Sequence, residues 1–142
     1  MNTGILLDIR NEASVDLAKK IQREIKNNGD NSVIFYSNIC QTKEPFDTAV
    51  MSKNSIWSFS GNLICLSIDL TKEATEVPSK IKVFYMPDAD SFFDPLYLLL
   101  INKDVTVACA DKEMKTKLTR TIGSNRNIVF EEDIAQLVRS IL

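Results

Sequence analysis

The sequence predicts one three-layer α/β/α domain, with helices on both faces of a mainly parallel sheet. Short apolar runs rich in β-branched residues alternate with amphipathic helical patterns along the whole chain, as in successive βαβ units. Some of these runs are apolar throughout, which is typical of strands covered on both faces. Because such crossovers are right-handed and 142 residues suit one core, we expect residues 1–142 to form a single Rossmann-like (flavodoxin-like) domain.

The chain opens with a βαβ unit. The apolar run at residues 4–9 is the first strand, and Asn11 or Ser14 can cap the helix that follows at 12–28. The apolar stripe expected on this helix is Ala13, Leu17, Ile21 and Ile25. The cations expected to face water are Lys19, Lys20, Arg23 and Lys26. An Asn-Asn-Gly sequence ends the helix, and the next strand is SVIFYS at 32–37.

The middle of the chain predicts three more strands and a short helix. The first strand, at 48–51, is followed by a turn-like segment, and NLICLSI at 62–68 is the second. A helix over residues 69–77 is expected to be capped by Asp69, and a third strand follows at 80–86.

The last third predicts three helices and two strands. An Asp-Pro pair opens a helix at 95–102, and a strand at 105–110 leads to an amphipathic helix at 111–122. A short strand at 127–130 precedes a closing helix at 131–142, whose apolar residues recur with helical spacing.

Missing residue types exclude several functions. The chain has no histidine, which removes Ser-His-Asp triads, Cys-His pairs and histidine-based zinc sites. Its four glycines are far apart, so neither a GxGxxG turn nor a P-loop can form. Its 17 basic and 19 acidic residues give a net charge of -2, which is unlike a dedicated nucleic-acid-binding protein.

The three cysteines fit neither a disulfide framework nor a metal site, because they are odd in number and widely spaced. Cys65 and Cys109 lie in apolar runs, and we expect both to be buried on central strands. The start of the chain has no basic region and only a short apolar run, unlike a signal peptide or a membrane span. We therefore expect a cytoplasmic protein.

Polar residues follow the predicted strands at the edge where open α/β sheets bind ligands. They are Asp8, Arg10, Asp69, Asp88, Asp90, Asp111 and Lys112. Such an acidic edge suits Mg²⁺, and Asp88-Ala89-Asp90 has the DxD spacing of metal-dependent nucleotide enzymes. The alternative is that most of these carboxylates cap helices or lie at their positive ends. We predict that Asp88 and Asp90 are not a metal site.

Two other features are candidates for ligand contact. The helix at 111–122 and its following loop carry an excess of cations, which suits a nucleotide phosphate or simply a solvated face. Trp57 and Phe59 could stack on a base or, more commonly, cover the end of the sheet.

Two segments carry a family resemblance. IWSFSGNLICLSIDLTKEA at 56–74 and KVFYMPD at 82–88 resemble small uncharacterised proteins of tailed phages, which are similar to one Rossmann-like half of a GT-B glycosyltransferase. A complete GT-B enzyme holds its nucleotide-sugar between two such halves. The resemblance implies the fold, a nucleotide-sugar-binding edge and, for a phage-encoded chain, the host cytoplasm.

The segment before and within the helix at 95–102 predicts an interface, because its apolar residues leave no polar face for water. We expect a homodimer or a stable protein partner to cover Phe92, Phe93, Leu96, Leu98 and Leu100. The alternative is that the closing helix covers them within one chain.

Together these observations favour a small Rossmann-like module that binds a nucleotide or nucleotide-sugar. We expect no catalytic residue, metal or cofactor, and action through self-association or a partner. The ligand-binding candidates are Asp8, Arg10, Trp57, Asp69, Asp88, Asp90, Asp111 and Lys112. An alternative is an Mg²⁺-dependent transferase or phosphatase that uses the strand-end carboxylates, and a third is a receiver-like signalling domain with Asp69 as acceptor.

Overall fold

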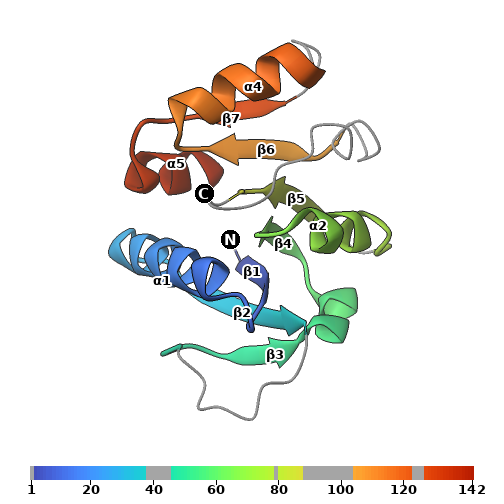
Figure 1. Ribbon diagram of the computed structural model, residues 1–142. Helices are drawn as coiled ribbons and strands as arrows, with labels where there is room; N and C mark the ends of the chain where they lie inside the picture. Colours follow the sequence, from blue (N-terminus) through green and yellow to red (C-terminus); the bar gives the residue numbers. More distant parts are fainter. Residues whose placement is uncertain (1, 38–45, 79, 88–103, 123–126) are drawn as a thin grey trace.

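The computed structural model describes residues 2–37, 46–78, 80–87, 104–122 and 127–142. These residues form a seven-stranded, all-parallel sheet with helices on both faces (Figure 1), so the predicted fold class is confirmed. The strands are β1 (Thr3–Asp8), β2 (Ser32–Ser37), β3 (Val50–Ser52), β4 (Gly61–Cys65), β5 (Ile81–Tyr85), β6 (Thr106–Cys109) and β7 (Ile128–Phe130). The helices are α1 (Glu12–Asn27), the 3-10 helix η1 (Lys53–Ser58), α2 (Ile68–Thr75), α4 (Lys112–Ile122) and α5 (Ile134–Ile141).

The strand order is β3-β2-β1-β4-β5-β6-β7. The chain first builds outward from β1 to β2 and β3, and then returns to place β4 on the other side of β1. This is the Rossmann order 3-2-1-4-5-6 with one strand added. The direction of building therefore reverses between β1 and β4.

Alternate residues of each strand enter two separate cores, because side chains along a strand point to opposite faces. On β4, Leu63 and Cys65 belong to the core that includes side chains of η1, α2 and α4. Ile64 belongs to the core that includes side chains of α1 and α5. The burial of β4 on both faces explains why Leu63, Ile64 and Cys65 are all apolar.

The buried face of α1 differs from the predicted stripe. The buried residues are Ser14, Ala18, Ile21 and Ile25, whereas Ala13 and Leu17 are only half-buried. A stripe spaced strictly by four residues drifts around a helix of 3.6 residues per turn, so contact with the sheet needs mixed steps of three and four. The four predicted cations are exposed, as expected.

The first turn of α1 decides between the two predicted caps. The side chain of Asn11 accepts a hydrogen bond from the backbone N–H of Ser14 at 3.2 Å, so Asn11 is the N-cap.

The run NLICLSI is split between a strand and a helix. The strand β4 ends at Cys65, and Ser67 caps α2 by accepting a hydrogen bond from the backbone N–H of Leu70 at 3.3 Å. The prediction that Asp69 caps this helix is therefore wrong. Asp69 is an exposed residue of the first turn. The predicted strand at 62–68 ends too late because Ile68 is apolar. Ile68 belongs to the helix and packs from there on the core of this face of the sheet.

The remaining elements depart from prediction in small ways. The strand β3 begins two residues later than the predicted 48–51, and α5 begins at Ile134 rather than at residue 131. The strand β4 is the central strand as predicted, but β6 lies next to the edge strand β7. The predicted helix at 95–102 lies outside the described residues.

The amino end of β4 is held by contacts between distant parts of the chain. Asn62 is buried, and its side-chain Nδ2 donates to the carbonyl oxygen of Ile141 at 2.9 Å, which fixes the end of α5 to the sheet. Gly61 has a φ of 134°, and a Cβ there would lie 2.2 Å from the carbonyl oxygen of Asn2.

No helix in the described part of the chain is long and apolar enough to cross a membrane.

Candidate functional site

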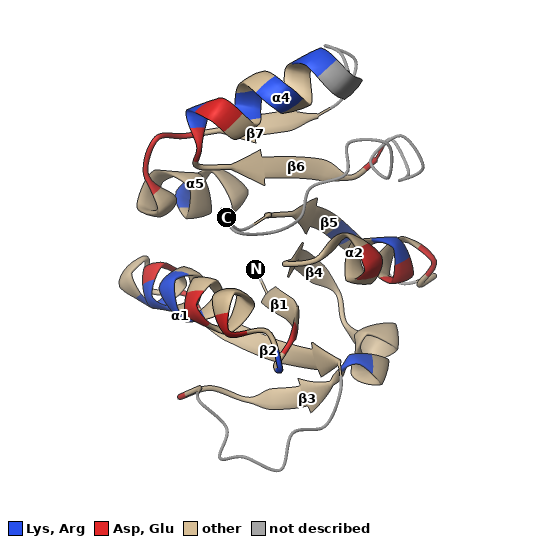
Figure 2. Cartoon of the chain, in the orientation of Figure 1, with Lys and Arg blue, Asp and Glu red and all other residues tan. Residues whose placement is uncertain are grey.

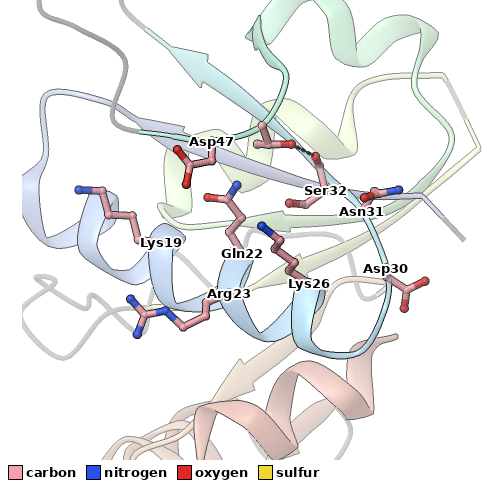
Figure 3. A pocket seen from close by; sticks show the side chains of 9 residues that line it. Lys19, Gln22, Arg23, Lys26, Asp30, Asn31, Ser32 and Asp47 are labelled. Carbon is pink, nitrogen blue, oxygen red and sulfur yellow. Dashed lines mark hydrogen bonds between the residues drawn. The ribbon is translucent and has the colours of Figure 1, made fainter.

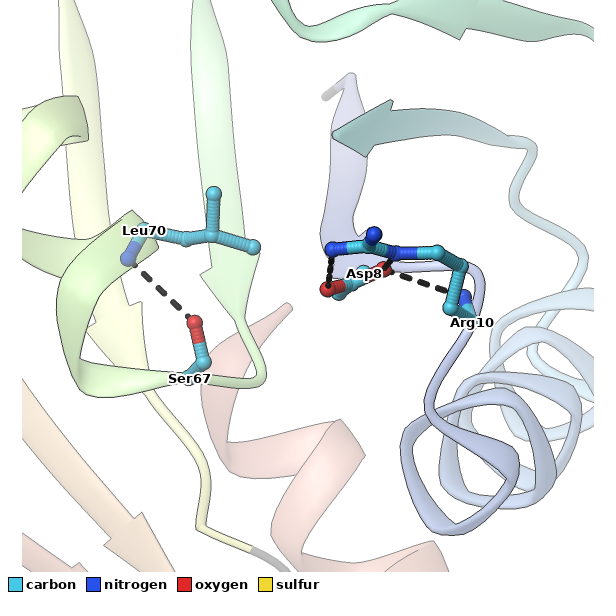
Figure 4. A network of polar contacts seen from close by, with 4 residues as sticks. All are labelled: Asp8, Arg10, Ser67 and Leu70. Carbon is cyan, nitrogen blue, oxygen red and sulfur yellow. Dashed lines mark hydrogen bonds and ion pairs between the residues drawn. The ribbon is translucent and has the colours of Figure 1, made fainter. Parts of the chain in front are cut away.

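The reversal of strand order brings the ends of β1 and β4 side by side. Leu6 on β1 is in register with Cys65 on β4, so the two strands finish at the same edge. From there the chain enters α1 on one face and α2 on the other. Open α/β sheets bind ligands at such a switch point, because the two connections diverge and leave room between them. Figure 4 shows the polar groups of both connections.

Asp8 and Arg10 form the polar group on the β1 side of the switch point. The Asp8 carboxylate accepts from the Arg10 backbone N–H at 3.0 Å, and from Nε and Nη2 of its guanidinium at 3.4 Å each. The Arg10 side chain is 63% exposed and that of Asp8 is 32% exposed. The backbone bond fixes the turn, while the long, exposed guanidinium contacts are weak. Arg10 thus places an exposed guanidinium at the end of β1, with only long contacts to the Asp8 carboxylate.

The helices that begin at this edge cap themselves. Besides Asn11 on α1 and Ser67 on α2, Asp111 accepts from the backbone N–H of Glu113 at 2.8 Å at the start of α4. The predicted capping role is therefore confirmed for Asp111. Because these side chains occupy donors that a phosphate would otherwise use, a phosphate here must be held chiefly by side-chain cations.

Asp111 and Lys112 lie apart from the switch point along the edge. They follow β6, and β5 separates β6 from β4. Asp69 is on the β4 side of the switch point, in the first turn of α2. The predicted pair Asp88 and Asp90 falls outside the described residues. Among the residues that the structure describes, no group of three or more His, Cys, Asp or Glu could hold a metal ion.

The two aromatic candidates have different environments. Phe59 packs edge-to-face on Phe35, with ring centroids 5.2 Å apart, so it covers the sheet as in the simpler interpretation. Trp57 is 61% exposed on η1, which follows the carboxyl end of β3 (Figure 1). Trp57 keeps a free surface on which a ring could stack.

The two described thiols are buried, as expected, and unsuited to nucleophilic chemistry. Burial raises the pKa of Cys65 to about 12, an effect that a hydrogen bond with the Thr71 side chain only partly offsets. Burial also raises the pKa of Cys109 to about 11, although the nearby Lys115 lowers it. Because the thiolate is the reactive form, both thiols stay protonated near neutral pH.

The cationic helix α4 presents most of its charge to solvent. Basic positions recur along α4 (Figure 2). The side chains of Lys112, Lys115, Lys117 and Arg120 are exposed, and Lys115 lies 4.7 Å from the centre of the Phe130 ring.

Two features escaped sequence reasoning. Ser67 lies inside an apolar run, and the available sequence signal for its role is that serine is a favoured N-cap residue. A hollow at the opposite edge of the sheet is lined by Lys19, Arg23 and Lys26. Their spacing of four and three residues places them on one face of the helix, and this was the sequence signal for a cationic surface there.

Comparison of the chain with protein-family models, curated proteins and solved structures found no match.

Proposed function

We propose that this chain is a Rossmann-type binding module that takes a nucleotide or nucleotide-sugar at the switch point between β1 and β4. The observation that carries the proposal is the Asp8–Arg10 pair, an exposed cation held over the strand end by weak bonds at the site where this topology binds ligands. Rossmann domains with a glycine-rich turn cradle phosphate with backbone N–H groups. Here the guanidinium of Arg10 takes that role.

Ligand entry exchanges one ion pair for another. The guanidinium contacts with Asp8 are both 3.4 Å long, and breaking such an exposed pair costs at most about 1 kcal/mol. Arg10 then donates two hydrogen bonds to a phosphate, for which its planar fork is suited. The Asp8 carboxylate, which keeps its hydrogen bond from the Arg10 backbone N–H, accepts a further hydrogen bond from a ribose or sugar hydroxyl. The pair thus distinguishes a ligand with both groups from simple phosphate.

The resemblance of residues 56–74 and 82–88 to half of a GT-B glycosyltransferase makes a nucleotide-sugar the first ligand to test. A single half covers only one side of such a ligand, so we propose that the module works with a second copy or another protein. The residues expected at that interface, Phe92, Phe93, Leu96, Leu98 and Leu100, lie outside the described part of the chain. Sedimentation velocity at micromolar concentration tests self-association, and a strict monomer would contradict the homodimer.

Isothermal titration calorimetry with UDP-glucose tests the ligand site. We expect UDP-glucose binding that Arg10→Ala weakens at least about tenfold, since losing hydrogen bonds to a charged group costs about 1.5–3 kcal/mol. Asp8→Asn should weaken UDP-glucose binding more than binding of inorganic phosphate, because the ligand hydroxyls lose a carboxylate acceptor. Arg139→Ala removes an exposed cation elsewhere, on α5, and should change nothing.

Absence of binding, or equal weakening by Arg10→Ala and Arg139→Ala, would contradict the proposal. Repeating the titration with Mg²⁺ examines the alternative of a metal-dependent enzyme. Tight Mg²⁺ binding in the absence of nucleotide would favour that alternative.

A further inference from the structure

A polar hollow of about 500 Å³ lies at the amino edge of the sheet, opposite the switch point. It is bounded by the outer side of α1, the turn before β2 and the segment before β3. Helix α1 contributes Lys19, Gln22, Arg23 and Lys26 to its lining, and Asp47 lies on the facing segment. This volume is within the usual range of about 300–1,000 Å³ for small-molecule sites.

The cations of this hollow lie on one face of α1. Lys19, Arg23 and Lys26 are separated by four and three residues, so they form one row along the helix. Asp30 and Asp47 line the same hollow, yet among the described residues none of these five groups is within 4.0 Å of an opposite charge. With three cations and two carboxylates, the lining has one net positive charge.

The side chains are arranged around the hollow from two directions. Figure 3 shows Gln22 and Lys26 reaching from α1 toward Asp47 and Ser32, whereas Asp30 points away from the centre. Lys19 and Arg23 extend along the α1 side. The part nearest Lys26 and Gln22 therefore offers N–H donors, and the opposite wall offers a carboxylate acceptor.

The walls of the hollow are held in place by the fold. The hydroxyl of Thr48 donates to the carbonyl oxygen of Ser32 at 2.5 Å, and the backbone N–H of Ile34 donates to the carbonyl oxygen of Ala49 at 2.9 Å. The helix wall is anchored by the fully buried side chains of Ile21 and Ile25. Only the flexible ends of the cations need to move when an anion enters.

We infer that this hollow binds a phosphate-bearing small molecule, with Lys26 and Gln22 at the phosphate and Lys19 and Arg23 along its rim. A single exposed cation attracts an anion weakly in water, but a ligand with several phosphate oxygens contacts several donors at once. Asp47 accepts a hydrogen bond from a ligand hydroxyl and disfavours ligands that are anionic throughout. This site is separate from the switch point, so the inference does not depend on the function proposed above.

A nitrogen–proton NMR titration with inorganic pyrophosphate tests the site. We expect saturable shifts in α1 around Gln22 to Lys26 and at Asn31 and Ser32, with an affinity that falls as salt is added. Lys26→Ala should raise the dissociation constant about tenfold, the effect of losing one charge-assisted hydrogen bond. Asp47→Asn should tighten pyrophosphate binding, because it removes a carboxylate from the wall.

Lys20→Ala is the matched control, since Lys20 is an exposed cation of the same helix that does not line the hollow. It should leave the dissociation constant within about twofold of the wild-type value, as expected for a distant surface charge. Equal losses for Lys20→Ala and Lys26→Ala, or no saturable shifts, would overturn the inference. Arg10→Ala should not affect this titration, which separates its outcome from that of the switch-point experiment.

Discussion

The two edges of the sheet are held together in different ways. At the carboxyl edge, the polar bonds of Asp8, Ser67 and Asp111 join residues two or three apart in the sequence. At the amino edge, the side chain of Asn62 donates to the carbonyl oxygen of Ile141, 79 residues along the chain. Backbone bonds between neighbouring strands occur at both edges, from Asn62 to Asn2 at this one and from Leu66 to Leu6 at the other. The side-chain bond of the amino edge therefore joins elements that meet only when the whole chain folds.

This difference separates stability from function in the molecule. Local bonds form and break without disturbing the core, so the carboxyl edge can rearrange around a ligand at little cost. Long-range bonds connect β1, β4 and α5, and their loss weakens the whole domain. We expect substitutions at the amino end of β4 to lower the free energy of unfolding, and those at Asp8 and Arg10 to affect binding alone.

Gly61→Ala should have the largest effect on stability. Its φ of 134° is unfavourable for any side chain, and the new Cβ would meet the Asn2 carbonyl oxygen at 2.2 Å. We expect a loss of about 3 kcal/mol in the free energy of unfolding, measured by urea denaturation. Gly29→Ala is the control, because its φ of 81° is also positive but its Cβ would meet no described atom within 4 Å. It should cost about 1 kcal/mol, and an equal cost at both glycines would refute close packing at this edge.

Asn62→Ala should have the next largest effect. The substitution removes the donor to the Ile141 carbonyl, an oxygen in the last turn of α5 that has no helical partner. A loss of about 2 kcal/mol is expected, as for a buried group left without its hydrogen bond. Asn31→Ala, at an exposed position of the same edge, should change stability by less than about 0.5 kcal/mol. Similar values for the two variants would contradict a structural role for Asn62.

The helix caps of the carboxyl edge should contribute less. Asn11→Ala and Ser67→Ala each remove one side-chain acceptor from a helix start, which costs about 1 kcal/mol. Asn11→Asp and Ser67→Thr keep the acceptor and should retain wild-type stability in the same urea experiment. A cost above that of Asn62→Ala would show that the carboxyl edge, rather than the amino edge, holds the domain together.

The smallest effect concerns pH and vanishes near neutrality. The thiol of Cys65 has a pKa of about 12 in the folded protein, against an ordinary value of 9.0. Below pH 9 both states keep the proton, but between pH 9 and 12 only the unfolded chain loses it, so stability falls as pH rises. Cys65→Ala should lack this part of the alkaline decline, so the difference in free energy of unfolding between the wild type and the variant should change as pH rises above 9. A parallel decline in both proteins would contradict the burial of this thiol.

Sequence patterns predicted the order of the elements well because each strand and helix has its own periodicity. The strand β2 was predicted to the residue, since SVIFYS is bounded by polar residues and is β-branched and aromatic within. The end of β4 was predicted less well, because Leu66 and Ile68 stay apolar after the strand has ended. Local periodicity cannot show which apolar residues reach the core from a helix and which from a strand.

The candidate site was predicted in part. The carboxyl-edge position of Asp8 and Arg10 follows from parallel topology alone, and the structure places the two side chains in contact. The strand order, which puts β4 rather than β6 beside β1, could not be obtained from the sequence. For that reason the prediction groups Asp111 and Lys112 with the switch-point residues, although they follow β6, which β5 separates from β4.

The most direct test of the switch-point site is chemical-shift mapping by NMR with UDP-glucose. The account predicts saturable shifts concentrated in the turn from Asp8 to Asn11 and in the β4–α2 connection around Ser67. The resonance of the Arg10 side-chain Nε–H should also shift, because this group gives up its hydrogen bond to Asp8. Saturable shifts confined to other parts of the molecule, or none at all, would contradict it.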